Sequence, residues 1–255
     1  MGQPPVIDLN ADLGESFGAW RLGDDEALLS IVTSANIACG FHAGDPLTIR
    51  RACAAAVARG VSIGAQVSYR DLAGFGRREM EVPADELAAE VLYQIAALDG
   101  IARAEGGRVG YVKPHGALYH RAARDPVQAA ALASAIRAYD AALPLLTLPG
   151  SAAATAGASA GLTVVAEAFA DRAYAADGKL VPRGHPGAVL SNPVQVAARA
   201  VAMVTSGAVD SAGGPAVRLD PRSVCIHGDT PGAVALARAV RRALEEAGAL
   251  LVPFA

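Results

Sequence analysis

The sequence predicts an α/β fold in which successive β/α units build a TIM-like barrel of parallel strands. First, short β-rich runs alternate with longer alanine-rich stretches as far as the C-terminus. Second, the 255 residues, 53% hydrophobic and 18% charged, suffice for one large core, and α/β barrels commonly use this length as a single domain, here 1–255. Third, ionisable residues gather where the expected strands end.

Seven runs of the chain are expected to form strands. They are 6–12, 34–40, 62–68, 108–113, 144–148, 162–167 and 223–227. Because a parallel neighbour needs a crossover connection, strands separated by helices favour parallel pairing. Seven such units can close as a barrel or spread as a doubly wound sheet, and hydrophobic periodicity alone does not separate the two.

Helices are expected between these strands, and several have marked ends. The expected ranges are 24–32, 46–59, 83–105, 126–142, 151–160, 193–206 and 231–247. Four starts place a capping side chain before a proline, at Asp45, Asp125, Asn192 and Thr230. Glycines at 60, 106 and 248 mark helix ends. The apolar positions of 83–105 form one stripe, so this helix is expected to cover the outside of a barrel.

The charge balance excludes two classes of partner. A net charge of −3, without an arginine cluster interleaved with aromatic residues, argues against nucleic acid and anionic membrane. The N-terminus has no basic region followed by an apolar run, and no window reaches the roughly 18 apolar residues of a membrane span. We therefore expect a cytoplasmic protein with a small-molecule partner. Three cysteines without C-x-x-C spacing are expected to be buried thiols.

Polar residues follow six of the seven expected strands, whereas the loops after the helices are short and mostly Gly, Ala, Arg or Ser. In a barrel, but not in a doubly wound sheet, all strand ends meet at one mouth. This asymmetry predicts one catalytic face and one structural face, and it favours the barrel.

Four of these residues are candidates for catalysis. Asp12 and Glu15 end an apolar strand, where a polar side chain without a partner is costly, so a functional role is favoured. His42 alone would be interpreted as structural, but beside Asp12 it could be a metal ligand or a general base. Lys113 is one of 2 lysines among 22 basic residues; it could hold a carboxylate or phosphate, or simply pair with a carboxylate.

Other strand-end residues are expected to contact substrate. These are Asn10, Asp45, Gln66, His115, His227 and Asp229. Asp45 could equally be a helix cap, and both histidines could be structural. Gly228 and the helix expected from Pro231 leave N–H groups that could seat an anion.

The same strand-end runs resemble the LamB/YcsF family. The matching segments are 8–15, 38–45, 74–78, 113–119, 169–174 and 227–232, in family order and across nearly the whole chain. The resemblance implies an irregular seven-stranded (β/α) barrel of the glycoside hydrolase/deacetylase type. It also implies the activity of the A component of an ATP-hydrolysing 5-oxoprolinase, which works with subunits B and C to open the lactam of 5-oxoproline to glutamate.

One departure from the family pattern concerns metal binding. Many members carry histidine and proline where this chain has Gln66 and Val67. A glutamine amide is a poor ligand for zinc-like ions, so a metal held by Asp12 and His42 would be weakened. A divalent metal is otherwise expected as Mg²⁺ accompanying ATP.

Lactam opening suggests a division of labour among these residues. Asp12 or Glu15 would be the base for water, His42 would relay or donate a proton, and Lys113 would bind the substrate carboxylate or a phosphorylated oxygen. The sequence has no G-x-x-x-x-G-K-[ST] run, so a nucleotide site would not be a P-loop and could be shared with the partner subunits.

Two alternative functions and one segment stay open. The first alternative is a metal-dependent carbohydrate deacetylase, and the second is a non-catalytic subunit that binds 5-oxoproline for its partners. The glycine- and proline-rich segment 175–191 is expected to be a long loop or hairpin that serves as a lid or a docking surface.

Overall fold

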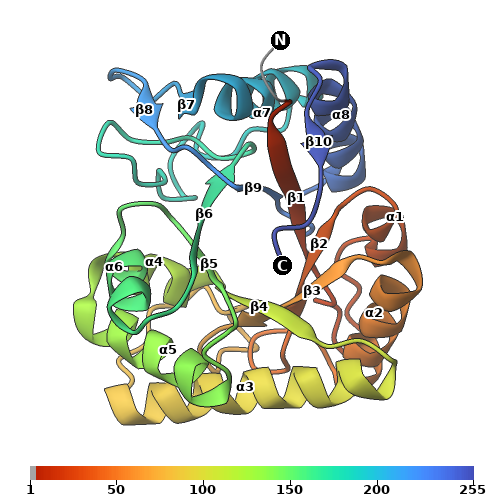
Figure 1. Cartoon of the computed structure of the whole chain (residues 1–255), viewed down its shortest axis with the longest axis vertical. Coiled ribbons are helices and arrows are strands. Elements are labelled where there is room, and N and C mark those ends of the chain that lie inside the picture. Colours follow the sequence, from red (N-terminus) through yellow and green to blue (C-terminus); the bar gives the residue numbers. More distant parts are fainter. Residues whose placement is uncertain (1–3) are drawn as a thin grey trace.

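Seven parallel strands close into a barrel in the computed structural model, which describes residues 4–255 (Figure 1). Residues 1–3, the start of the expected span 1–255, lie outside the described residues. The strands of the barrel are β1 (Val6–Leu13), β2 (Ser34–Ala38), β3 (Ser62–Val67), β4 (Val109–Pro114), β5 (Leu145–Thr147), β6 (Val164–Phe169) and β9 (Ser223–Ile226). They follow one another in this order, and β9 also pairs with β1, which closes the ring. The barrel prediction is therefore confirmed.

The register of the strands brings their polar ends to one mouth. Asp12 on β1 pairs with Asn36 on β2, and Gln66 on β3 pairs with Lys113 on β4. Since all these strands run in the same direction, the residues at their carboxyl ends lie on one face of the barrel. This face is where the sequence predicted the functional residues.

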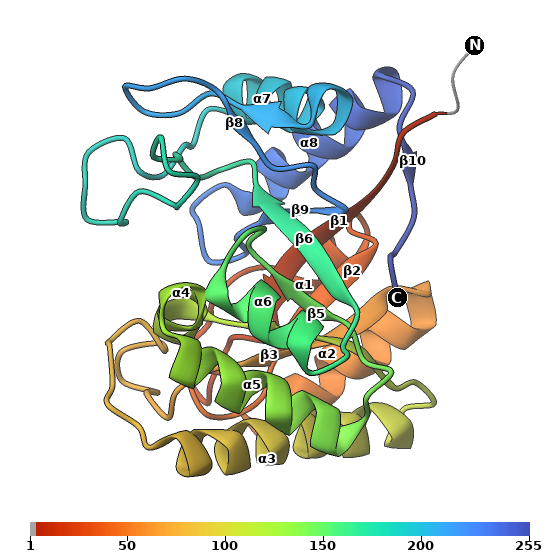
Figure 2. The same ribbon diagram turned by 60° about the vertical axis from the view of Figure 1, so that its left-hand side comes forward.

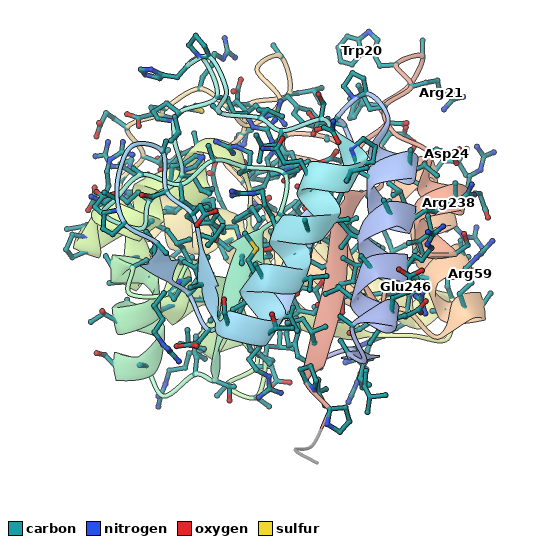
Figure 3. All side chains as sticks on the ribbon, turned by 90° about the horizontal axis from the view of Figure 1, so that it is seen from above. Trp20, Arg21, Asp24, Arg59, Arg238 and Glu246 are labelled. Carbon is teal, nitrogen blue, oxygen red and sulfur yellow. The ribbon has the colours of Figure 1, made fainter. Side chains whose placement is uncertain are left out.

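Helices surround the barrel, as the alternating sequence pattern predicted (Figure 1). They are α1 (Asp25–Leu29), α2 (Pro46–Arg59), α3 (Ala84–Ala104), α4 (Gly116–Arg124), α5 (Pro126–Tyr139), α6 (Ala152–Ser159), α7 (Pro193–Ser206) and α8 (Ala233–Glu246). Figure 3 shows the charged side chains Arg59, Arg238 and Glu246 on the outside of this layer. The predicted apolar stripe of α3 is buried, with Leu87 and Leu98 both fully inaccessible.

Three of the four predicted helix caps are present. Asp45, Asp125 and Asn192 each accept hydrogen bonds from the first backbone N–H groups of their helices. Thr230 does not cap a helix: α8 begins at Ala233, after Gly232 in a left-handed conformation, and has no side-chain cap. That prediction was wrong because proline can start a turn as readily as a helix.

Several elements were not predicted. The helix α4 begins directly after β4, and a small antiparallel pair, β7 (Ala208–Val209) and β8 (Val217–Arg218), lies between α7 and β9. The strand β10 (Leu250–Leu251) pairs with the start of β1, and the following tail packs Phe254 on Tyr111, with 4.8 Å between the ring centroids. In the part of the chain that the structure describes, none of the helices combines the length and apolar character needed to span a membrane.

The segment after β6 is a long irregular loop that projects from one side of the barrel (Figure 2). Short bridges fasten it, one between Arg172 and Val189 and another between Tyr174 and Leu180. The Arg172 side chain is 1% exposed and donates to the carbonyl oxygens of Val181, at 2.6 Å, and Ala188, at 3.2 Å. This buried guanidinium therefore joins separate parts of the loop to one another, beside the cavity that Arg172 also lines.

Candidate active site

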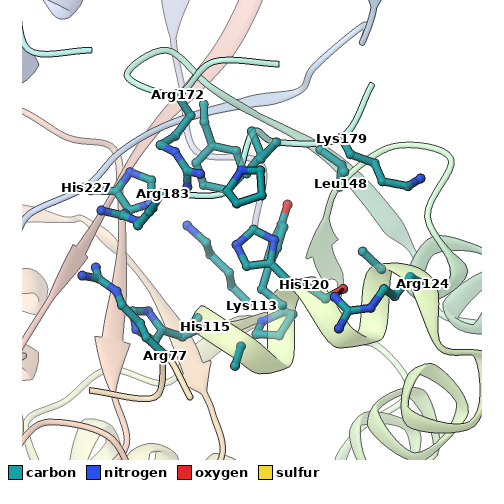
Figure 4. Close-up of a pocket in the computed structure, with 18 of the residues that line it drawn as sticks. Arg77, Lys113, His115, His120, Arg124, Leu148, Arg172, Lys179, Arg183 and His227 are labelled. Carbon is teal, nitrogen blue, oxygen red and sulfur yellow. Dashed lines mark hydrogen bonds between the residues drawn. The ribbon is translucent and has the colours of Figure 1, made fainter. Parts of the chain in front are cut away.

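A cavity of about 460 Å³ opens at the carboxyl ends of the strands. Asp12, Lys113 and His115 contribute to its lining from β1 and the end of β4, and His227 contributes from the segment after β9. The loop after β6 adds further lining residues, including Arg183. Figure 4 shows Lys113, Arg183 and His227 converging on this space from different parts of the chain. The segment predicted as a lid or docking surface thus forms a wall of the cavity.

The Lys113 ammonium is buried among acceptors at the base of the cavity. Its Nζ lies 2.7 Å from Glu167 Oε1, 3.2 Å from Asp12 Oδ1, 3.3 Å from Asn10 Oδ1 and 3.1 Å from Cys225 Sγ. Burial alone would lower the pKa of Lys113, but the charges of Asp12 and Glu167 raise it well above its usual value. The lysine is therefore a fixed positive charge whose three N–H donors already have acceptors nearby.

The two candidate carboxylates have opposite pKa shifts. Burial works against ionisation of Asp12, but the charge of Lys113 is the largest opposing influence, and the pKa of Asp12 is well below its usual value. Burial raises the pKa of Glu15 well above its usual value, and the charge of Asp12 adds to this effect. Asp12 is therefore the ionised member of the pair, and Glu15 is the one that tends to keep a proton.

Behind the cavity, Gln66 connects three other predicted residues. Its Nε2 donates to Glu15 Oε1 at 3.0 Å and lies 3.0 Å from His115 Nδ1, while its Oε1 lies 3.2 Å from His42 Nε2. The rings of His42 and His115 stack with centroids 4.3 Å apart. Burial lowers the pKa of both histidines. The pair is therefore neutral near pH 7.

On another side of the cavity, His227 is held by Asp171. His227 Nδ1 lies 2.9 Å from Asp171 Oδ2, and the His227 backbone N–H donates to the same oxygen at 3.2 Å. Burial opposes ionisation of Asp171, but the charge of His227 and these hydrogen bonds keep its pKa below the usual value. The carboxylate fixes the orientation of the imidazole and leaves Nε2 without a partner among residues 4–255.

The rim of the cavity is strongly basic. Arg77 forms an ion pair with Asp229 at 2.6 Å, and Arg124 pairs with Glu79. The Arg183 side chain makes no hydrogen bond or ion pair with another of the residues that the structure describes. An anionic ligand would therefore find an uncommitted guanidinium at the mouth.

The structure brings most of the predicted residues together. Asp12, Glu15, His42, Lys113, Gln66 and His115 form one buried cluster, and His227 faces the same cavity. Asn10 lies inside the barrel, where its Nδ2 donates to Ser223 Oγ at 2.6 Å. Asp229 is at the rim with Arg77, and Asp45 is half-buried in the helix-capping role that the sequence also suggested.

Several residues of the site were not identified from the sequence. Glu167 lies in β6 and Asp171 follows it, within the polar run expected after the sixth strand, but neither was assigned a role from the sequence. Asn36 is different, since it lies within β2 and donates to Asp12 Oδ1 at 2.9 Å. Arg183 belongs to an irregular loop, and no local pattern indicates that it reaches the cavity.

One group of residues has the composition of a metal site. Ligand atoms of Glu15, His42 and His115 lie within 4.8 Å of one another; Asp12, expected as a ligand with His42, is not in the group. The Gln66 amide, however, is within hydrogen-bond distance of all three residues. It occupies the position between them, so the residues as they stand do not fit a metal ion.

Comparisons with known proteins identify relatives over nearly the whole chain. A model of the LamB/YcsF family matches residues 7–255. The A component of 5-oxoprolinase from Streptomyces avermitilis is 60% identical over 250 residues, which are 98% of this chain and 100% of that protein.

Two solved structures resemble the chain to different extents. The lactam utilization protein from Thermus thermophilus is 47% identical, with a TM-score of 0.93 over 98% of this chain and 100% of that one. A family 4 carbohydrate esterase from Streptomyces lividans, 12% identical, has a TM-score of 0.51 over 98% of this chain and 93% of that one, a likeness of fold alone. The chain belongs to the LamB/YcsF family.

Proposed function

We propose that this chain is the A component of a 5-oxoprolinase and cleaves 5-oxo-L-proline to L-glutamate, coupled to hydrolysis of ATP to ADP and phosphate. The observation that carries the proposal is the ionised Asp12 beside the fixed charge of Lys113 at the base of the cavity. The family membership of the chain and the name of its 60% identical relative support the substrate. Subunits B and C are the proposed partners.

Asp12 is the carboxylate best placed to activate water. Its Oδ1 is held by Asn36 and Lys113, while its Oδ2 accepts no hydrogen bond from the described residues and lies 3.7 Å from His115 Nδ1. Glu15 is not among the lining residues of the cavity. When an oxyanion develops and interacts with Lys113, the lysine stabilises the Asp12 carboxylate less. The basicity of Asp12 therefore rises at the stage when it must accept a proton from water.

The departing lactam nitrogen needs a proton, and His227 is the proposed donor. The sequence assigned this role to His42, but His42 is fully buried behind the cavity with Gln66 and His115. His227 lines the cavity and is oriented by Asp171 through Nδ1. An imidazole held in this way by a carboxylate can present Nε2 to a reacting group.

The basic rim is proposed to receive the anionic parts of the reactants. The N–H donors of Lys113 are engaged by Asp12 and Glu167, so we assign the substrate carboxylate to Arg183 instead. A phosphoryl group derived from ATP would activate the lactam carbonyl, and Arg77 is near enough to the lining to meet it. The nucleotide itself, with Mg²⁺, is proposed to be shared with subunits B and C.

The direct test is to mix the chain with subunits B and C and to measure glutamate and phosphate released from 5-oxoproline and ATP. We expect both products in equal amounts, and neither without ATP.

Hydrolysis of an acetylated sugar by the isolated chain, lost on chelation, would instead support a metal-dependent deacetylase. If substitutions at Asp12 change only 5-oxoproline binding, the chain is a non-catalytic binding subunit. The cytoplasmic location stays a prediction.

A further inference from the structure

The amide of Gln66 lies at the centre of a group of side chains that would otherwise be a candidate metal site. Gln66 is fully buried, and so is His42, while Glu15 and His115 are 3% and 5% exposed. The amide is within 3.2 Å of all three neighbours. No other described residue is hydrogen-bonded to more than one member of this set.

The hydrogen-bonding capacity of a primary amide matches these three neighbours. An amide offers two N–H donors and one carbonyl acceptor. The two donors face the Glu15 carboxylate and His115 Nδ1, and the acceptor faces His42 Nε2. This assignment makes Nε2 the protonated nitrogen of both rings, and His115 Nε2 accordingly lies 3.2 Å from the carbonyl oxygen of Phe75. The amide thus reaches all three neighbours without a cation and leaves only His42 Nδ1 among their ring nitrogens without a partner in residues 4–255.

The spacing of these atoms favours an amide over a metal. Nitrogen and oxygen ligands bind zinc at about 2.0–2.2 Å, which places ligand atoms roughly 3.3–3.6 Å apart in a tetrahedral site. Here His115 Nδ1 and Glu15 Oε1 are 3.9 Å apart, and each is 3.0 Å from the amide nitrogen. The cluster is therefore expanded to the length of hydrogen bonds.

Two further features oppose a cation. A metal-bound histidine nearly always donates its second N–H to an acceptor, so a metal on His42 Nε2 would leave a buried Nδ1–H without a partner among residues 4–255. Asp12, which lies 3.7 Å from His115, also already balances the buried ammonium of Lys113 at 3.2 Å. A divalent ion in this place would have only the Glu15 carboxylate to balance its charge, because Asp12 is committed to Lys113.

We infer that Gln66 takes the place of a cation in this chain, so that the Glu15–His42–His115 cluster is a metal-independent framework that positions His115 beside Asp12. Gln66 is then a positioning residue. The same geometry implies a latent metal site: a histidine at position 66 would add an imidazole ligand between residues that are already gathered there.

The test is metal binding by the isolated full-length chain, which does not depend on lactam cleavage. Chelator-treated wild-type protein is titrated with Zn²⁺ by calorimetry and with Co²⁺ by visible absorption. We expect no stoichiometric site in the wild type. Gln66→His should gain one site with the absorption of tetrahedral Co²⁺. Its metal affinity should exceed that of the wild type by more than roughly 10–100-fold, which is the effect of residues that only hydrogen-bond to metal ligands.

Matched variants locate the site. The double variant Gln66→His with His42→Ala should lose the gained affinity, whereas Gln66→His with the surface change His185→Ala should keep it. Gln66→Leu should lower Tm, because it leaves Glu15 and His115 without a donor. Wild-type protein that binds one Zn²⁺ at micromolar concentration, with the binding abolished by His42→Ala, would overturn the inference even if a position-66 variant fails to fold. Because the experiment measures metal affinity, its outcome for the Gln66 inference does not depend on whether the proposed activity is correct.

Discussion

Asp12 depends on its neighbours for its ionised state. Lys113 contacts one of its oxygens, and Asn36 donates to the same oxygen at 2.9 Å. A side chain this deeply buried would otherwise resist ionisation, so the lysine and the carboxylate form a functional unit. Asp12→Asn should affect the reaction more than the fold, because the ammonium keeps Glu167 as a partner, whereas loss of Lys113 should also destabilise the fold.

We expect Asp12→Asn to lower glutamate formation by about 100- to 10,000-fold, the usual contribution of a general base. The amide keeps the shape of the side chain but cannot accept the proton from water. The rate is measured with subunits B and C present, and circular dichroism checks the fold. Asp45→Asn is the matched control, since asparagine caps a helix as well as aspartate. A near-normal rate in Asp12→Asn removes Asp12 from the mechanism.

The free energy of unfolding depends on pH in part through His120. Burial, with the nearby charges of Arg172, Arg183 and Arg124, lowers the pKa of His120 to about 4. The unfolded chain therefore takes up a proton near pH 6.5 that the folded chain resists until about pH 4. This contribution to stability is complete above pH 6.5 and is lost as the pH falls through that window.

His120→Asn should therefore flatten the decline of stability between about pH 6.5 and 4. Urea unfolding at a series of pH values measures the effect, with His185→Asn as the control on the exposed loop. Equal slopes in wild type and His120→Asn would contradict the expectation.

At the scale of elements, much of the barrel follows from local signals in the sequence. Asp45 and Asn192 were predicted as caps and accept the first N–H groups of α2 and α7, because capping depends on residues only two or three positions apart. The helix α4 was missed because it begins at Gly116, directly after β4, with a positive φ of 59° that no periodic pattern announces. Boundaries set by a strand-to-helix turn need the tertiary structure.

The site was predictable to the extent that strand ends converge in a barrel. Asp12, Lys113 and His115 were found because each ends or follows a strand. The central place of Gln66 was not predictable, since it results from packing of its side chain on β3 with side chains from the segments after β1, β2 and β4. Arg183 reaches the cavity only because Arg172 fixes a long loop.

We expect Arg172→Gln to destabilise the protein by about 2–3 kcal/mol, as expected for lost hydrogen bonds from a charged donor. The loop that carries Arg183 should loosen, so the KM for 5-oxoproline should rise. Urea unfolding gives the first quantity and steady-state kinetics the second, and limited proteolysis should show faster cleavage within 175–191. His185→Ala, exposed on the same loop and not part of the cavity lining, is the control. Unchanged KM and cleavage would show that Arg172 does not restrain the loop.

At the scale of the whole molecule, the two ends of the barrel have separate tasks. Phe254 covers the end opposite the cavity, packed on Tyr111 and close to Leu146 and Val165. We expect Phe254→Ala to lower the free energy of unfolding by about 1–2 kcal/mol, less than for a fully buried phenylalanine. Because Phe254 reaches Asp12 only through Tyr111 and Asn36, kcat should stay within about twofold of the wild type.

Chemical denaturation and steady-state rates on the same preparation check this separation. Val252→Ala, a change at an exposed position of the same C-terminal tail, is the control for nonspecific effects of altering the tail. A fall in kcat that matches the loss of stability would mean that the tail also shapes the catalytic face.

The pairing of β9 with β1 joins segments more than two hundred residues apart. During synthesis on the ribosome, β1 emerges early but must wait for its second neighbour until almost the entire polypeptide has been made. The nascent chain therefore exposes an unpaired strand edge for most of its translation. A prematurely terminated product would be a target for chaperones and proteases.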